Sequence, residues 1–209
     1  MRSKHLSATI VVLLACLGLT ACNADDAQES PASDLAASST PTPSPEPATP
    51  SAPPPPPATP YPHPTPQEPE GMYQHTDGGA IVTAKYFVEL MGYQACTGDI
   101  EKMKKISLPE CEYCNGRMEY AKHVLEIGGW ADNYHTTNIT LRDYLPPPEG
   151  EIGDLAVGLT VDIPGYFSYI PDENGLEETA AYTALIDVLL QWEDDRWMVL
   201  AAAGYKYDQ

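Results

Sequence analysis

Apolar side chains recur at two different spacings in the second part of the chain, and the change of spacing separates expected helices from expected strands. The first stripe repeats every three or four residues and consists of Ile81, Ala84, Val88, Met91 and Ala95. This spacing places the five side chains on one face of a helix, which we expect over about residues 79–97. Thr76 or Asp77 can cap its first turn, and Gly98 can end it.

Two further helices are expected before the strands begin. Asp99 can cap a short helix that runs through about Lys105. The sequence Ser107-Leu108-Pro109-Glu110 then has the form of a capping box with proline in the first turn, so a third helix is expected to begin there. Its apolar stripe has the same spacing as the first and consists of Cys111, Cys114, Met118, Ala121 and Leu125. Both thiols are therefore expected to face the core, in a helix that Gly128-Gly129 ends.

After Trp130 the apolar positions alternate with a period of two, which is typical of strands. We expect strands over residues 134–145 and 155–163, and two long strands over about 178–192 and 196–206. Pro164-Gly165 interrupts the pattern, so residues 166–170 are either a bulged continuation of the preceding strand or a separate short strand. Trp192 and Trp197 flank the last turn and can pair across it. Helices followed by a run of antiparallel strands predict an α+β domain with the helices packed on one face of a sheet.

The first 22 residues show neither period and have the parts of an export signal, with basic Arg2 and Lys4 before an apolar run. That run spans 12 residues, from about Ala8 to Leu19, whereas a helix that crosses a bilayer needs about 20. The closing tetrad Leu19-Thr20-Ala21-Cys22 resembles the lipobox of bacterial lipoproteins, in which the cysteine is acylated and the bond before it is cut. The resemblance implies a lipid anchor on Cys22 and a place on the extracytoplasmic face of the cell membrane. Plain secretion with an unmodified cysteine is the alternative.

Proline dominates the stretch that follows, since residues 23–70 hold 16 of the 22 prolines. Proline at this density fixes φ and removes amide donors, so a solvated, disordered spacer of largely polyproline II character is expected. At about 3.1 Å per residue it would reach on the order of 150 Å. The expected organisation is a signal peptide over 1–21, a lipidated cysteine and proline-rich spacer over 22–70, and an α+β domain over 71–209.

Charge narrows the classes of partner. After residue 70 the chain has nine basic and 23 acidic residues, a net charge of −14. Such a field repels phosphate backbones and anionic lipid headgroups, so neither nucleic acid nor direct membrane-surface contact is expected. The expected partners are the membrane, through the lipid, and a protein or a small apolar ligand.

The pair Cys111 and Cys114 is the most specific chemistry in the predicted domain. A thiol at a helix N-terminus is activated, but Glu110 and Glu112 oppose that activation, and the βαβ order of a thioredoxin-like unit is absent. A structural disulfide suits an oxidising compartment. Loop entropy gives about 2 kcal/mol to a Cys111–Cys114 bridge and about 3 to one from Cys96 to Cys111, which does not choose between them. No metal site is expected, because zinc would need two more ligands.

The order of elements, ending in a Trp-turn-Trp hairpin, resembles the cone fold of nuclear-transport-factor-2-like and ketosteroid-isomerase-like domains. The motif Pro109-Glu110-Cys111-Glu112-Tyr113-Cys114, followed by Gly128-Gly129-Trp130 behind a lipobox and a proline spacer, is similar to an uncharacterised family of actinobacterial lipoproteins. That resemblance spans most of residues 75–205. It implies a curved antiparallel sheet in a cystatin-like cone and a Cys111–Cys114 disulfide, with Cys96 left as a thiol. It also leaves room for a homodimer through the sheet.

Acid–base chemistry would require His123, His135, Asp132 and Asp143 to meet in one pocket. Their spacing does not require this, and His123 lies off the apolar stripe, so it is expected to be solvated. No catalytic residue and no cofactor is predicted.

Three aromatic residues, Trp130, Tyr166 and Tyr169, would line the mouth of a cone and stack on an apolar ligand, although aromatic side chains beside a sheet are commonly core. The sequence thus predicts a lipid-anchored binding or interaction module. The alternatives are a cone-fold enzyme that acts on a small apolar substrate and a thiol–disulfide protein that uses Cys111 and Cys114.

Overall fold

The computed structural model describes residues 54–55, 62–146, 153–171, 173 and 175–207. All of them belong to one compact unit within residues 49–209. The signal peptide, Cys22 and most of the predicted spacer lie outside the described residues. None of the helices in the described ranges is long and apolar enough to cross a membrane.

The helices follow the predicted order. A short 3-10 helix, η1, covers Glu70–Tyr73, and α1 (Asp77–Thr97), α2 (Glu101–Ile106) and α3 (Glu112–Glu126) come after it. The side-chain oxygen of Thr76 accepts from the Gly79 backbone N–H, and α1 ends at Gly98, whose φ of 69° is left-handed. Asp99 Oδ1 accepts from the Glu101 N–H at the start of α2. The predicted cap at Thr76 is therefore used, and Asp99 bonds the first turn of α2 although Ile100 is its N-cap residue.

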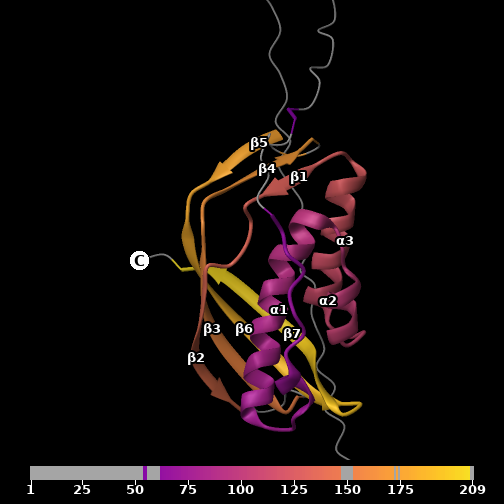
Figure 1. Ribbon diagram of the computed structural model, residues 1–209, viewed down its shortest axis with the longest axis vertical. Helices are drawn as coiled ribbons and strands as arrows, with labels where there is room; N and C mark the ends of the chain where they lie inside the picture. Colours follow the sequence, from indigo (N-terminus) through magenta and orange to yellow (C-terminus); the bar gives the residue numbers. More distant parts are fainter. Residues whose placement is uncertain (1–53, 56–61, 147–152, 172, 174, 208–209) are drawn as a thin grey trace, which may run out of the picture. The chain divides into compact units, whose positions relative to one another are not determined.

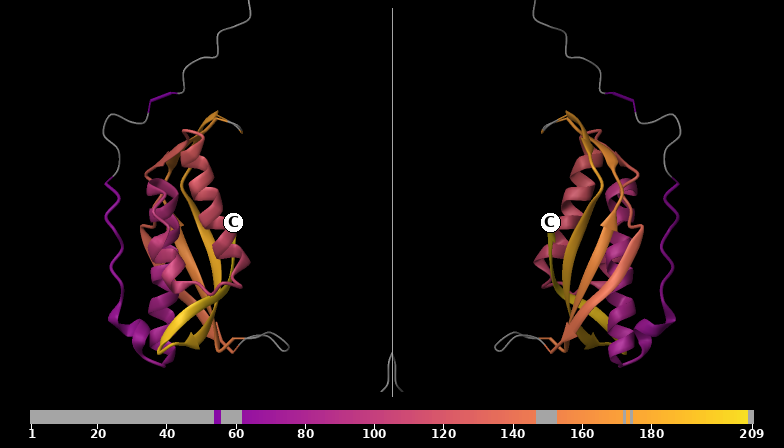
Figure 2. Two further views of the ribbon diagram at one scale, coloured as in Figure 1. Left: turned by 90° about the vertical axis from the view of Figure 1, so that its right-hand side faces the viewer. Right: turned by 90° about the vertical axis from the view of Figure 1, so that its left-hand side faces the viewer.

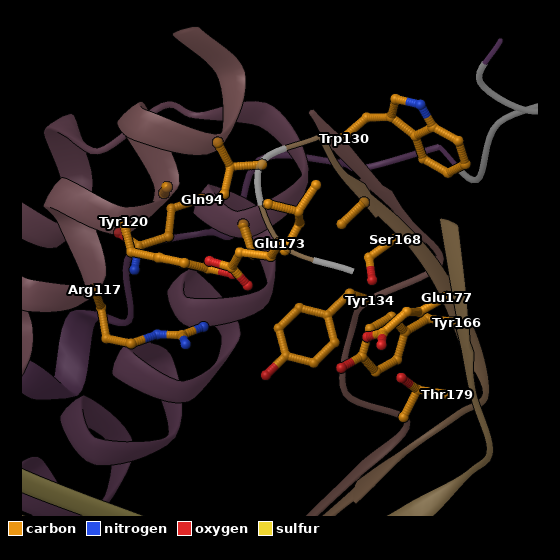
Figure 3. Close-up of a pocket in the computed structure, with 15 residues that line it drawn as sticks. Gln94, Arg117, Tyr120, Trp130, Tyr134, Tyr166, Ser168, Glu173, Glu177 and Thr179 are labelled. Atoms are coloured by element: carbon orange, nitrogen blue, oxygen red, sulfur yellow. The ribbon is translucent and has the colours of Figure 1, made fainter. Parts of the chain in front are cut away.

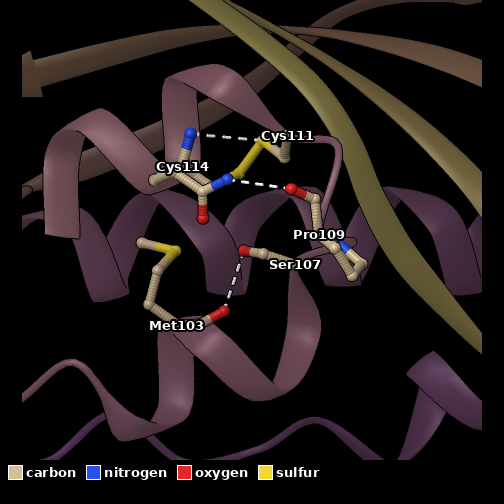
Figure 4. Close-up of a disulfide and its surroundings, with 6 residues drawn as sticks. Met103, Ser107, Pro109, Cys111 and Cys114 are labelled. Atoms are coloured by element: carbon tan, nitrogen blue, oxygen red, sulfur yellow. Dashed lines mark hydrogen bonds between the residues drawn. A yellow bond between two sulfur atoms is a disulfide. The ribbon is translucent and has the colours of Figure 1, made fainter.

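The predicted capping box before α3 is wrong. Ser107 Oγ instead donates to the Met103 carbonyl (2.8 Å) at the end of α2. The helix begins five residues later, where Cys111 Sγ accepts from the Cys114 backbone N–H at 3.2 Å (Figure 4). The apolar stripe of α3 also ends differently, since Val124 is buried and Leu125 is 39% exposed.

The strands form two antiparallel sheets. A four-stranded sheet has the order β2-β3-β6-β7, and a small sheet has the order β1-β4-β5. The strands are β1 (Trp130–Asp132), β2 (Asn138–Leu145), β3 (Leu155–Ile163), β4 (Tyr166–Ile170), β5 (Gly175–Thr179), β6 (Tyr182–Glu193) and β7 (Arg196–Lys206). The short β1 was not predicted, and the strand expected from residue 134 begins at Asn138.

The single strand predicted over 178–192 is wrong, because it divides into β5 and β6. In the four-stranded sheet, β3 pairs with β6 as far as Ile163 opposite Tyr182. In the small sheet, β4 pairs with β5 from Tyr166 opposite Thr179. Pro164-Gly165 therefore breaks one strand at the same level at which residues 180–181 break its neighbour. Figure 2 shows this long hairpin, passing from one sheet into the other, from two sides.

The three helices pack on one face of the four-stranded sheet (Figure 1), which confirms the α+β class. Alternate residues of β3 and β6 point into the core they share with α1, and these are Leu155, Val157, Leu159, Val161, Ile163, Ala184, Ile186, Val188 and Leu190. Trp192 and Trp197 pair across the β6–β7 turn with ring centroids 5.6 Å apart, as predicted. The small sheet continues the β3–β6 hairpin past the end of this core.

Candidate functional site

A cavity of about 250 Å³ lies between α1, α3 and the small sheet (Figure 3). Strand alternation sets its sheet side, because residues two apart on a strand share a face. Tyr166 and Ser168 of β4 line the cavity, and their register partners on β5, Thr179 and Glu177, line it beside them. The intervening Phe167 faces away and is exposed.

The helix side comes from the end of α1 and one face of α3. Gln94 and Ala95 belong to α1, and the α3 residues on this side are Arg117, Tyr120, Ala121 and Val124. Their spacing of three, one and three residues places them on one helix face. Along that face the polar Arg117 and Tyr120 precede the apolar Ala121 and Val124.

Tyrosines fill the space between the two sides. Tyr134 follows β1 and is tilted against Tyr166, with ring centroids 4.7 Å apart. It is also hydrogen-bonded to Tyr182 of β6. Burial raises the pKa of both Tyr134 and Tyr182, although the nearby Arg117 charge opposes that rise. Both phenols therefore stay protonated at neutral pH, and act as hydrogen-bonding groups rather than as bases.

Arg117 is the cation of this cavity. It reaches from α3 toward the Tyr134 hydroxyl (Figure 3), and its Nε is buried without a hydrogen-bond partner in the described part of the chain. The acidic residues that line the cavity are Glu173, in the β4–β5 turn, and Glu177, in the middle of β5. Burial, and then the charge of Glu173, raise the pKa of Tyr120, which lies within electrostatic reach of Arg117 as well.

Gln94 is the most deeply buried polar side chain of the site, at 1% exposure. Neither its amide oxygen nor its amide nitrogen has a hydrogen-bond partner among the residues described. An unsatisfied buried polar group costs roughly 1–3 kcal/mol. The site thus keeps a polar group where the fold alone would favour an apolar one.

Of the three aromatic residues predicted at the cone mouth, Tyr166 points into the cavity. Trp130 borders the cavity, but its indole turns away from it (Figure 3), to the same face as its register partner Tyr169, and the two ring centroids are 6.3 Å apart. The Trp130 indole N–H donates to the carbonyl of Pro54 at 3.4 Å. The proline-rich segment therefore touches the outer face of the small sheet.

The four acid–base candidates do not come together. Asp132 and His135 lie near each other after β1, and His63 joins them, with its Nε2 4.0 Å from Asp132 Oδ1. His123 is exposed on α3, as predicted, and Asp143 pairs with Arg142 on β2 at 3.5 Å. Within the described ranges, no three histidine, cysteine or acidic residues are placed to hold a metal ion.

The structure joins Cys111 and Cys114 in a disulfide, with their Cα atoms 5.3 Å apart. Both residues are fully buried under the start of α3, away from the cavity. Cys96 is the free cysteine of the described chain, and its thiol donates to the Tyr134 carbonyl at 3.5 Å. Burial raises the pKa of Cys96 to about 11, which leaves it a poor nucleophile at neutral pH. Cys22 lies outside the described residues.

The sequence also places the chain among known proteins. Residues 46–203 match the model of DUF6318, described as a family of unknown function. The chain belongs to this family. The match covers α1 to α3 and both sheets, and so includes every residue named for the cavity. Among curated proteins no relative is found.

Solved structures with a similar arrangement share little sequence with the chain. The intermembrane space region of the chloroplast protein ARC6 is 12% identical, with a TM-score of 0.47 over 64% of this chain and 99% of that one. An uncharacterised cystatin-like protein from Caulobacter vibrioides is 11% identical, with a TM-score of 0.40 over 62% and 90%. A calcium/calmodulin-dependent kinase II association domain from Xanthomonas campestris, described as a putative one, is 10% identical, with a TM-score of 0.31 over 63% and 89%. At this level of similarity the neighbours indicate neither a ligand nor an activity.

Proposed function

We propose that this DUF6318 protein is a lipoprotein, anchored through Cys22 on the extracytoplasmic face of the cell membrane, whose folded domain binds a small molecule in the cavity between α1, α3 and the small sheet. The observation that carries the binding function is the pairing of aromatic walls with polar groups that the protein leaves unsatisfied. Gln94 and Arg117 both contribute buried atoms without a partner in the described chain. Ligand sites are commonly apolar cavities with a few such convergent polar groups.

Burial of the disulfide favours binding over thiol–disulfide exchange. An attacking thiolate must reach a sulfur atom of the disulfide, and both Cys111 and Cys114 are fully buried. The remaining thiol, Cys96, is held protonated by its raised pKa. Redox turnover would therefore require the start of α3 to open.

The proposed anchor has a direct test in the native host. Replacing Cys22 with serine removes the atom that would be acylated, so we expect the protein to move from the membrane fraction to the soluble or secreted fraction. The matched control is Cys96→Ala, which should leave the fractionation unchanged. Membrane retention of the Cys22→Ser protein would falsify the anchor.

The proposed binding function is tested on the mature chain, residues 22–209, with Cys22→Ser to keep it free of lipid. A library of small metabolites is screened by thermal unfolding, because a ligand that binds only the folded state raises the melting temperature. We expect hits whose effect disappears in Arg117→Met but persists in Lys122→Met, which removes an exposed charge from the same helix. A screen with no hits, or hits indifferent to Arg117, contradicts binding in this cavity.

A further inference from the structure

The cavity holds charges of opposite sign at different places. Arg117 projects from the α3 side, whereas Glu173 and Glu177 come from the β4–β5 hairpin (Figure 3). The phenol of Tyr120 lies within electrostatic reach of all three charges. In Figure 3 the Glu173 carboxylate lies beside Tyr120 on the α3 side, whereas the Glu177 carboxylate lies beside Tyr166 on the sheet side, so a ligand that fills the cavity meets Glu177 across from Arg117.

Arg117 differs from a surface arginine of the same domain. Arg142 contacts the carboxylates of both Asp143 and Asp187 on the four-stranded sheet. Arg117 makes no ion pair in the part of the chain that the structure describes, although the domain has 23 acidic residues. Its neighbours in the cavity are the neutral hydroxyls of tyrosines. The guanidinium is thus available for an anionic group, which it can bind through two parallel hydrogen bonds.

The two glutamates are equally available. Neither Glu173 nor Glu177 forms an ion pair with a basic residue of the described ranges. Glu177 points to the cavity side of β5, opposite Ser168, whereas the adjacent Glu178 lies opposite the outward-facing Phe167. A cationic group held against β5 would contact the Glu177 carboxylate.

Together these groups disfavour ligands of a single charge. A simple anion is attracted by Arg117 but repelled by Glu177, and a simple cation is attracted by Glu177 but repelled by Arg117. A molecule with both charges is attracted at both ends.

We infer that the cavity is selective for a small zwitterion of the α-amino acid class, with its carboxylate on Arg117, its ammonium on Glu177, and an uncharged side chain against Tyr134 and Tyr166. This inference rests on the proposed binding function. The cavity volume of about 250 Å³ lies just below the usual range for drug-sized ligands, which suits a compound as small as a free amino acid.

The test uses the lipid-free mature chain and the twenty common amino acids, with binding followed by amide chemical shifts and calorimetry. The tightest uncharged-side-chain amino acid is then compared with its decarboxylated amine and its deaminated acid. For phenylalanine these are phenethylamine and 3-phenylpropionate. We expect each single-charge analogue to bind at least roughly tenfold more weakly than the parent, because it loses one charge-assisted contact.

Charge-neutral variants assign each end of the ligand. Arg117→Met should weaken the amino acid but not its amine analogue. Glu177→Gln should weaken the amino acid but not its acid analogue. Lys122→Met and Glu178→Gln are the matched controls, and each should leave every affinity unchanged.

The outcomes separate the inference from the proposed function. If a singly charged or neutral compound binds as tightly as the amino acid, and its binding depends on Arg117, the zwitterion is wrong and the binding cavity stands. If neither the amino acids nor the metabolite library bind, the proposed function fails together with the inference.

Discussion

The two sheets of this domain are built from the same long hairpin and yet have opposite interiors. In the four-stranded sheet, alternate residues of β3 and β6 are buried and apolar. In the small sheet, no residue of β4 or β5 is fully buried, and the side chains that line the cavity are mostly polar: Tyr166, Ser168, Glu177 and Thr179, with Ile170 as the apolar member. The four-stranded sheet thus supplies the stability, and the small sheet can hold a polar cavity because stability does not depend on it.

The two breaks in the hairpin produce this difference. Inward residues of β3 have odd numbers, from Leu155 to Ile163, whereas the inward residues of β4, such as Tyr166 and Ser168, have even numbers. A slip of one residue turns a whole strand face over, and the break at Pro164-Gly165 makes that slip. Residues 180–181 make the matching slip between β5 and β6. As a result, β4 and β5 turn polar side chains toward the cavity, whereas β3 and β6 turn apolar side chains toward the core.

The largest expected effect tests whether stability lies in the four-stranded sheet. Leu159 of β3 is 0% exposed, so Leu159→Ala should lower the free energy of unfolding by about 2–5 kcal/mol. Leu176 of the small sheet is 54% exposed, and Leu176→Ala should change it by less than about 0.5 kcal/mol. Urea unfolding measures both. Equal losses would break the contrast between the sheets.

The disulfide gives the next largest effect, because it fastens α3 to the core beside the four-stranded sheet. Replacing Cys111 and Cys114 together with alanine should lower the free energy of unfolding by about 2 kcal/mol. Cys96→Ala, nearer the cavity, should lower it by less than about 1 kcal/mol. Alkylation of the unfolded Cys22→Ser protein without reductant should label Cys96 alone. Labelling of Cys111 or Cys114 under those conditions would contradict the pairing.

Local patterns predicted most of the fold, because most of its elements are set by local physics. The stripe over 79–97, its cap at Thr76 and its stop at Gly98 needed only helical geometry. The capping box at Ser107 misled because a short preceding helix competes for the same hydroxyl, which bonds Met103 instead. The strand over 178–192 misled because alternation continues through residues 180–181, and only pairing with the broken partner strand reveals the kink.

The same kink hid the site. Read as one strand with β6, the segment places Glu178 on the inward face, whereas the slip places Glu177 there. Gln94 gave no signal either, since a glutamine in a helix is ordinarily solvated. Arg117 and Tyr120 could have been found from their helical spacing to Ala121 and Val124. Which sheet that face would meet depends on tertiary structure and not on the spacing.

A smaller effect is expected at the cavity, where replacing a buried polar side chain with an apolar one should raise the free energy of unfolding and not lower it. Gln94 is buried with both amide atoms unpaired in the described chain, and methionine has nearly its shape. Gln94→Met should therefore raise the free energy of unfolding by about 1 kcal/mol, while any ligand affinity falls. Gln191→Met on the half-exposed side of β6 is the control and should change neither. A loss of unfolding free energy as large as that of a core truncation would mean that the Gln94 amide is hydrogen-bonded in the folded protein. The polar cavity would then cost the protein no stability.

The smallest effect concerns Cys96, which joins the end of α1 to the Tyr134 carbonyl at the cavity wall. Burial raises its pKa from 9.0 to about 11, so the folded protein keeps the thiol proton to higher pH than the unfolded chain does. The stabilisation linked to this thiol is therefore complete below pH 9 and is lost as the pH rises to about 11. The unfolding free energy of Cys96→Ala is subtracted from that of the parent protein at each pH. The difference isolates the Cys96 contribution, because the tyrosines and lysines titrate in both proteins.

At pH 8, alkylation of Cys96 in the folded protein should be roughly a hundredfold slower than alkylation of a free cysteine, since the thiolate is the reactive form. A rate equal to that of a free cysteine would mean that this end of the domain opens readily, and that the cavity is not the preformed site proposed here.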